Sequence, residues 1–274
     1  MPAKPLILML AQRVRGLIGW RRRAAAFAAG AVSVLAMAPC FAWPVLWITL
    51  PVLVWLIDGA LTPPAATSPQ RPIPPPIAAS NWASFLPVRR RRHEGQRWYE
   101  RPPMAAAEIG WWFGFGYFVP GLFWVGEAFL VEAQTFAALL PFAVTLLPAY
   151  LALYWAAAAG LAARFWSGGP RRVLTLALTL SAAEWARGHA LSGFPWNTLG
   201  YALTYPLPLM QSAAVFGIYG LTLVGLLIFA LPPVLWGEQP ATIAGRRRRA
   251  AALAVAVVPL VLLALCGQIR LALA

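Results

Sequence analysis

Short arginine clusters divide this chain into long apolar stretches, and that alternation constrains its fold more than any other feature. The clusters stand at 21–23, 89–92, 171–172 and 246–249. Of the 274 residues, 61% are hydrophobic and 11% are charged, and the mean hydropathy is +0.68. Soluble domains are about half apolar and a quarter charged, whereas disordered chains are poor in apolar residues. The composition excludes both classes and predicts an all-α, polytopic membrane helix bundle.

The apolar stretches predict about seven transmembrane helices, since roughly 20 apolar residues cross a bilayer. The predicted spans are 24–39, 44–58, 105–125, 136–164, 173–190, 211–236 and 250–269. Pro39 and Pro44 favour a tight turn between the first two, which are interpreted as a helical hairpin. Pro141 and Pro148 predict that the long fourth span is tilted or kinked.

Four segments follow from this division. They are a basic N-terminus at 1–23, the hairpin at 24–58, a loop at 59–104, and five further spans within 105–270. Cytoplasmic loops carry an excess of basic residues. With seven spans, the side of the N-terminus holds 20 of the 22 Lys and Arg residues, and only Arg187 and Arg270 fall on the other. We therefore expect a cytoplasmic N-terminus and a C-terminus outside.

The first span has an alternative interpretation as a cleavable signal peptide. Arg21–Arg23, the apolar run after them and Ala36-Met37-Ala38 imitate one. Pro39 directly after the cleavage point argues against processing, and six further spans follow instead of a secreted domain. We expect an uncleaved first helix.

The loop at 59–104 is rich in proline and arginine. Such a segment buries too little surface to offset the entropy of ordering, so we predict a disordered cytoplasmic linker. Adhesion of Arg89–Arg92 to anionic lipid headgroups, worth about 1 kcal/mol per basic residue, is the alternative to a solvated loop.

Other function classes find little support. The formal net charge of +14 would fit nucleic acid, but the arginines flank apolar spans, and we exclude that partner. Cys40 and Cys266 have no C-x-x-C partner and are expected to be buried small residues. His93 and His189 are far apart in sequence and poorly accompanied by carboxylates. We predict no metal and no cofactor.

Ionisable residues within spans are costly and are therefore candidates for function. Asp58, Glu108 and Glu127 sit near span ends, where we expect them to reach headgroups or water. Glu184 and Arg187 are three residues apart, which puts them on one helical face within reach of each other. The pair is either a structural clamp or a device that orients an extracytoplasmic loop or a lipid headgroup.

The loop after this pair contains Gly193-Phe194-Pro195-Trp196. Gly193 and Pro195 break the helix, while Phe194, Trp196 and Tyr201 place aromatic rings at the membrane interface. An ordinary aromatic belt explains the rings, but it explains less well a rigid turn directly after an ion pair. The pattern indicates a lipid-facing site.

The third span carries a packing motif. Gly110 and Gly114 have the G-x-x-x-G spacing that permits close helix contact. Pro120 and Gly121 loosen the outer end of the span and leave Trp124 near the surface.

Together, three stretches resemble the membrane domain of apolipoprotein N-acyltransferase, the bacterial enzyme that completes lipoprotein acylation. The matching residues are Ala38 to Pro44, the Gly-Phe-Gly and Gly-x-x-Trp pattern at 114–124, and Glu184-x-x-Arg187-Gly188 continued by Gly193-Phe194-Pro195-Trp196 and Gly200-Tyr201. They occur in the family's order and cover most of the chain, although the insert at 59–104 is longer than usual. The resemblance implies a multi-pass protein of the bacterial inner membrane with its C-terminus in the periplasm.

The resemblance also implies a mechanism. In the family, a nitrilase-like domain after the seventh span uses a Glu-Lys-Cys triad. Its cysteine takes an acyl chain from phospholipid as a thioester and passes it to the α-amino group of a diacylglyceryl-cysteine. This chain stops at Ala274, before that domain, so we expect no catalytic residue here and no catalysis by the chain alone. What the resemblance carries over is a lipid-binding scaffold, whose candidate contributors to substrate access are Trp124, Glu184, Arg187, Phe194, Pro195 and Trp196.

Three roles remain open. The first is the embedded half of the enzyme, with phospholipid and diacylglyceryl lipoprotein as partners. The second is a truncated or split product whose nitrilase-like half is a separate polypeptide. The third is a small-molecule or lipid transporter that uses the Glu184–Arg187 pair, although the repeat symmetry common in transporters is not found.

Overall fold

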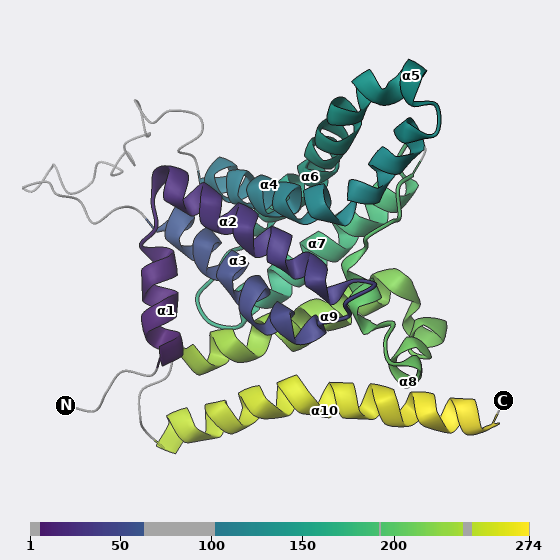
Figure 1. Cartoon of the computed structure of the whole chain (residues 1–274). Helices are drawn as coiled ribbons and strands as arrows, with labels where there is room; N and C mark the ends of the chain where they lie inside the picture. Colours follow the sequence, from purple (N-terminus) through teal and green to yellow (C-terminus); the bar gives the residue numbers. More distant parts are fainter. Residues whose placement is uncertain (1–5, 63–101, 192, 238–242, 274) are drawn as a thin grey trace, which may run out of the picture.

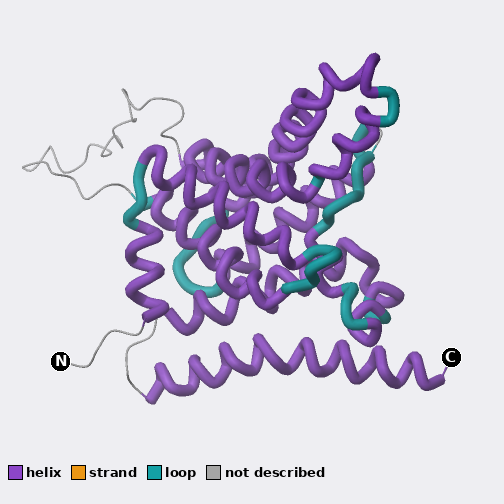
Figure 2. Tube along the Cα trace, viewed as in Figure 1, coloured by secondary structure: helices purple, strands orange, loops and turns teal. Residues whose placement is uncertain are grey.

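A computed structural model of the chain describes residues 6–62, 102–191, 193–237 and 243–273. Within these ranges the chain forms helices and loops and contains no strand (Figure 2). The predicted all-α fold is therefore confirmed. The predicted linker at 59–104 lies outside the described residues except at its two ends.

The elements are named in chain order in Figure 1. They are α1 (Leu6–Arg15), α2 (Gly19–Ser33), η1 (Val34–Ala36), η2 (Trp43–Val45), α3 (Leu46–Leu61), α4 (Pro102–Gly121), η5 (Phe123–Leu130), α5 (Ala133–Phe136), η6 (Ala137–Leu139), α6 (Leu140–Arg164), α7 (Arg171–His189), η7 (Leu199–Leu203), α8 (Leu207–Met210), α9 (Ala213–Gly237) and α10 (Ile243–Leu273).

Helix α4 packs closely against α6 through its small residues. A Cβ atom at Gly110 would lie 2.5 Å from the carbonyl oxygen of Trp155, and one at Gly114 would lie 3.0 Å from the Trp155 side chain. The first distance is too short for a real Cβ atom, and the second is shorter than nearly all real Cβ contacts. The predicted G-x-x-x-G contact is confirmed, and α6 is its partner.

Helix α4 packs equally closely against α2. A Cβ at Gly30 of α2 would overlap the carbonyl oxygen of Phe113, and a Cβ at Gly116 of α4 would overlap that of Phe27. Glycines on both helices therefore allow the two backbones to approach, and α4 occupies the middle of the bundle.

Helices α2 and α3 fold back on each other where the sequence predicts a hairpin. The hydroxyl of Ser33 donates to the hydroxyl of Thr49 over 2.8 Å, and both residues are buried. Helix α3 also contacts α9, where the Trp47 indole donates to the carbonyl of Ile228 over 3.0 Å. The hairpin is thus part of the core.

The basic N-terminus contains α1, a helix that the sequence analysis does not predict. Its Arg15 donates to a carboxylate oxygen of Asp58 over 3.0 Å. The indole of Trp166 donates to the other oxygen over 2.9 Å, and Arg172 Nε lies 3.4 Å from it. These groups surround the Asp58 carboxylate, which is 12% exposed and also lines an open cavity beside Leu61 and Pro102.

The other two predicted end residues differ from Asp58. Glu108 forms a partly exposed ion pair with Arg23 over 2.5 Å. Glu127 is exposed on η5. The exposure of Glu108 and Glu127 agrees with the expectation that these carboxylates lie near the ends of spans.

Among the described residues, four helices are long and apolar enough to cross a membrane, and five qualify if α4 and η5, which are bent by 46°, count as one span. Length and composition alone therefore identify four or five of the seven predicted spans in the described part of the chain. Helix α2 is short and contains Arg21–Arg23, and α7 carries three arginines and a glutamate. The structure supports a multi-pass, all-helical membrane protein.

Two predicted spans are interrupted. Gly217, with φ 63° and ψ 174°, breaks α9 near its start. The third span ends at Gly121, and the chain then forms η5, α5 and η6 before α6 begins. These short elements make an arm that projects from the bundle in Figure 1, with α5 at its tip.

The two cysteines are exposed, contrary to the expectation that they are buried. Cys40 lies in the surface turn between η1 and η2. Cys266 lies on α10, which packs mainly against α8 and α9 and runs along one side of the molecule (Figure 1). Much of the α10 surface therefore has no protein neighbour in the part of the chain that is described.

Candidate functional site

The candidate site is built around a buried ion pair on α7. Arg187 Nη2 lies 2.6 Å from Glu184 Oε2, and neither side chain is exposed. Their i, i+3 spacing places both on one face of the helix. The pairing predicted from the sequence is confirmed.

The second carboxylate oxygen of Glu184 is also satisfied. The indole of Trp155, on α6, donates to Glu184 Oε1 over 2.6 Å. The Trp155 ring stacks between Phe113 and Tyr117 of α4, with ring centroids 5.4 and 5.3 Å away. Three helices therefore enclose the carboxylate, and hydrogen bonds offset part of the cost of burying it.

Arg187 holds the loop that follows α7. Its Nη1 donates to the carbonyl oxygens of Phe194 and, over 2.9 Å, of Trp196. Its Nη2 donates to the hydroxyl of Thr198 over 3.2 Å, and that hydroxyl donates to the carbonyl of Pro195 over 2.7 Å. The guanidinium thus fixes the backbone on both sides of Pro195.

The same loop is tied to the end of α4. The hydroxyl of Tyr117 donates to the carbonyl of Asn197 over 3.0 Å. The Asn197 amide donates to the carbonyl of Gly121 over 2.8 Å, where a Cβ on Gly121 would overlap that amide. The Arg187 guanidinium lies over the Phe118 ring at 5.1 Å. These contacts hold the loop against the point where α4 bends into η5.

The six residues that the sequence singles out occupy different environments. Glu184 and Arg187 are buried, Phe194 and Pro195 are partly buried, and Trp196 is 51% exposed. The rings of Phe194 and Trp196 are 5.3 Å apart. Trp124, on η5 just beyond Gly121, is also 51% exposed. The network brings the first five together and leaves two indoles at the surface.

Sequence reasoning misses several members of this network. Asn197 and Thr198 directly follow the Gly-Phe-Pro-Trp motif, and this adjacency is the sequence signal that could have identified them as members of the network. Trp155 and Tyr117 lie inside apolar helices, where an aromatic residue facing lipid has the same sequence pattern. Nothing in the sequence separates them from an ordinary membrane-facing ring.

The network is suited to binding a ligand through the shape of its loop, since it offers no net charge. The ion pair neutralises itself, and Arg187 Nη1 holds two backbone carbonyls, while Arg187 Nε is buried without a hydrogen-bond partner among the described residues. Across the described ranges, no three His, Cys, Asp or Glu residues group closely enough to bind a metal ion. The network therefore presents a rigid aromatic loop to its surroundings.

Residues 82–231, which are 150 of the 274, match the family described as Apolipoprotein N-acyltransferase N-terminal domain. The chain belongs to this family. The resemblance inferred from the sequence motifs is confirmed. Tyr117, Trp155, Glu184, Arg187 and Asn197 all fall within the matched apolipoprotein N-acyltransferase segment.

Curated apolipoprotein N-acyltransferases from three organisms align with most of the chain. The protein of Rhodopseudomonas palustris is 48% identical over 92% of this chain, and that of Bradyrhizobium diazoefficiens is 46% identical over 93%. The protein of Brucella suis is 42% identical over 85%. These alignments cover 40%, 40% and 38% of the relatives, so the chain spans about two fifths of their length.

Proposed function

We propose that this chain is the lipid-binding membrane part of an apolipoprotein N-acyltransferase. Its substrates would be phospholipid, as the acyl donor, and the diacylglyceryl-cysteine of a lipoprotein, as the acceptor. The observation that carries the proposal is the buried Glu184–Arg187 pair, which holds the carbonyl groups of the loop and leaves Trp196 at the surface.

Physical chemistry supports a loop of this kind as a lipid contact. Indole rings combine a large apolar surface with one polar N–H group and are enriched where membrane meets water. A loop already fixed in the free protein loses little conformational entropy when a ligand binds. Trp196 on the fixed loop and Trp124 on the arm are the indoles that we assign to the lipid chains.

We further propose that the chain crosses the membrane seven times. The spans are α2, α3, bent α4 with η5, α6, α7, α9 and α10. Helix α7 can cross because its charges are paired within the bundle, Arg172 with Asp58 and Glu184 with Arg187. The arginine excess assigns the N-terminus to the cytoplasm and the Glu184–Arg187 network to the periplasmic half of the bacterial inner membrane.

Acyl transfer itself is assigned to a nitrilase-like domain, either in a longer form of the chain or in a separate polypeptide. Cys40 lies in a turn and Cys266 on an apolar helix, and neither stands beside a candidate base in the network. We expect the purified 274-residue chain to transfer no acyl group from phosphatidylethanolamine to a diacylglyceryl peptide. Any turnover by the purified chain would contradict this assignment, and the Cys40→Ala and Cys266→Ala substitutions would show whether either thiol carries it.

Binding tests the proposal directly. The chain in lipid nanodiscs is titrated with a fluorescent diacylglyceryl peptide, and anisotropy reports binding. Trp196→Ala is expected to weaken binding about tenfold, as for the loss of an aromatic anchor worth about 1.4 kcal/mol. Trp20→Ala is the matched control, because Trp20 is also exposed and lies at the start of α2, outside the network. Equal affinities for both variants would reject the assignment of Trp196.

A further inference from the structure

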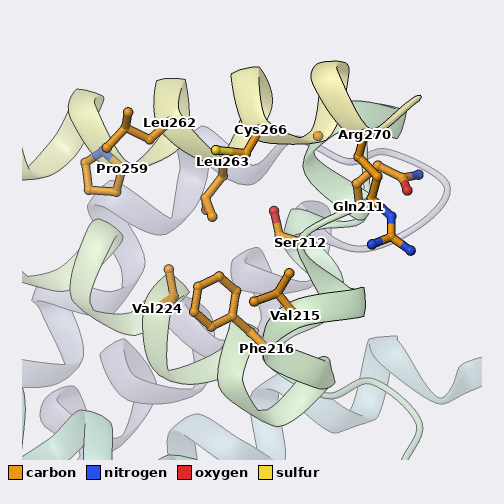
Figure 3. Close-up of a pocket in the computed structure, with 11 residues that line it drawn as sticks. Gln211, Ser212, Val215, Phe216, Val224, Pro259, Leu262, Leu263, Cys266 and Arg270 are labelled. Atoms are coloured by element: carbon orange, nitrogen blue, oxygen red, sulfur yellow. The ribbon is translucent and has the colours of Figure 1, made fainter. Parts of the chain in front are cut away.

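A cavity lies away from the Glu184–Arg187 network, between α10 and the α8–α9 corner (Figure 3). Its volume is about 450 Å³, which is within the range of about 300–1,000 Å³ for small-ligand sites. The wall consists largely of apolar side chains, among them Val215, Phe216 and Leu263. Both α9 and α10 are long and apolar enough to span a membrane, so the cavity lies between two candidate spans.

Two glycines determine how the helices around this cavity are placed. A Cβ on Gly267 would overlap the carbonyl oxygen of Pro208, so α10 touches α8 closely at that point. Gly217 interrupts α9 and separates its first turn from the rest of the helix. Val215 and Phe216 on that first turn line the side opposite α10 (Figure 3).

One end of the cavity is polar. Ser212 is only 6% exposed, and its hydroxyl points toward the space below α10 (Figure 3). Within the described part of the chain, Arg270 pairs with no carboxylate. Arg270 lies in the last turn of α10, beside Gln211. An apolar wall thus ends in a buried hydroxyl and a cation.

We propose that this cavity binds one phospholipid molecule of the surrounding membrane. One acyl chain occupies the apolar space, the phosphate accepts hydrogen bonds from Arg270, and a glycerol ester oxygen accepts one from Ser212. A cation at the end of a span is at the depth of lipid headgroups, and guanidinium groups bind phosphate strongly. The site shares no residue with the Glu184–Arg187 network and does not depend on the proposed function.

Native mass spectrometry of the full chain in mild detergent tests the proposal, with phosphatidylglycerol and dioleoylglycerol as probes. The parent chain is expected to retain one phosphatidylglycerol. Val215→Trp fills the cavity and should lower retention of both probes at least about tenfold, a change of about 1.4 kcal/mol. Val215 is 74% exposed, so its replacement leaves the packed core intact. Arg270→Gln should weaken phosphatidylglycerol alone, because dioleoylglycerol has no phosphate.

Matched variants separate this site from general lipid adhesion. Val257→Trp makes the same change on α10 outside the cavity and should retain lipid like the parent. Leu262→Trp, which also narrows the cavity, replaces Val215→Trp if that variant does not fold. Unchanged retention in a folded cavity-filling variant would overturn the proposal, as would an equal loss in Val257→Trp. Equal weakening of both probes by Arg270→Gln would reject the phosphate assignment.

Discussion

Glu184 has both carboxylate oxygens hydrogen-bonded although its side chain is fully buried. Trp155 donates to one oxygen and Arg187 to the other, each over 2.6 Å. Pairing lowers the cost of burying two charges, but removal of one partner leaves the other uncompensated. The same arginine holds the loop carbonyls, so the ion pair stabilises the loop as well as α7.

Glu184→Gln tests the ion pair as a structural clamp. The amide keeps the size of the side chain but leaves the Arg187 charge buried without a counter-charge, which should cost about 3–5 kcal/mol. We expect a lower yield of folded protein and a lower melting temperature in detergent. Glu127→Gln, at an exposed position, is the control and should melt like the parent. An unchanged yield and melting temperature for Glu184→Gln would refute the clamp.

Trp155→Phe removes the indole donor together with part of a buried ring. Phenylalanine keeps the aromatic stack with Phe113 and Tyr117 but removes the N–H group that reaches Glu184. The unsatisfied carboxylate oxygen should cost about 1–3 kcal/mol, read as a lower melting temperature. Trp185→Phe changes an exposed indole on α7 and serves as the control. Equal melting of the two variants would mean that the donor contributes nothing.

At the scale of helices, glycines determine how closely α2, α4 and α6 approach. Lipid chains are as apolar as leucine side chains, so helices in a membrane associate through close packing more than through the hydrophobic effect. Gly30 and Gly116 bring α2 to α4, and Gly110 and Gly114 bring α6 to α4. The network depends on this packing, because Trp155 must reach across to α7 beside α4.

Gly116→Ala tests the α2–α4 contact. The added methyl group would overlap the backbone of Phe27, which cannot move as a side chain can. Overpacking of this kind costs about 1–3 kcal/mol, and the melting temperature should fall. Gly225→Ala is the helical control, because its Cβ would meet its nearest neighbour, Leu203, at an ordinary 3.7 Å. Destabilisation of Gly225→Ala by the same amount would point to helix propensity or a general effect instead of the contact.

At the scale of the whole molecule, the described charged side chains gather at the two ends of the bundle. Arg15, Asp58 and Arg172 meet at one end, where Arg23 also pairs with Glu108. The opposite end carries the loop held by Arg187 and the C-terminal turn of α10. A membrane protein with this distribution is expected to keep its arginine-rich end in the cytoplasm.

Cysteine labelling tests that orientation. In a parent with Cys40→Ser and Cys266→Ser, Ala190→Cys and Gly168→Cys each introduce one thiol at an exposed position. A membrane-impermeant maleimide applied to spheroplasts should label the cysteine at position 190. The cysteine at position 168 should react only after the membrane is permeabilised. The opposite pattern would reverse the proposed orientation.

Local spacing predicted part of the candidate site. Residues at i and i+3 share a helix face in any α-helix, so the spacing of Glu184 and Arg187 predicts the pair that the structure contains. The Gly110–Gly114 spacing likewise predicted a close helix contact, although not its partner. The number of spans is harder to predict from the sequence, because arginines and breaks such as Gly217 divide apolar stretches in ways that composition does not specify.

By itself, the sequence determined that the chain is a helical membrane protein, because it has too few polar residues to cover the surface of a soluble domain. It also determined the family, because the family motifs are short and can be identified without knowing how the helices pack. Only the tertiary structure decided that the Trp155 indole donates a hydrogen bond to Glu184, 29 residues away. It also decided that Asp58 pairs with Arg15 of α1. It alone revealed the cavity beside Ser212 and Arg270. Such contacts depend on how helices are placed against one another, and hydrophobic periodicity does not encode which residues of distant helices meet.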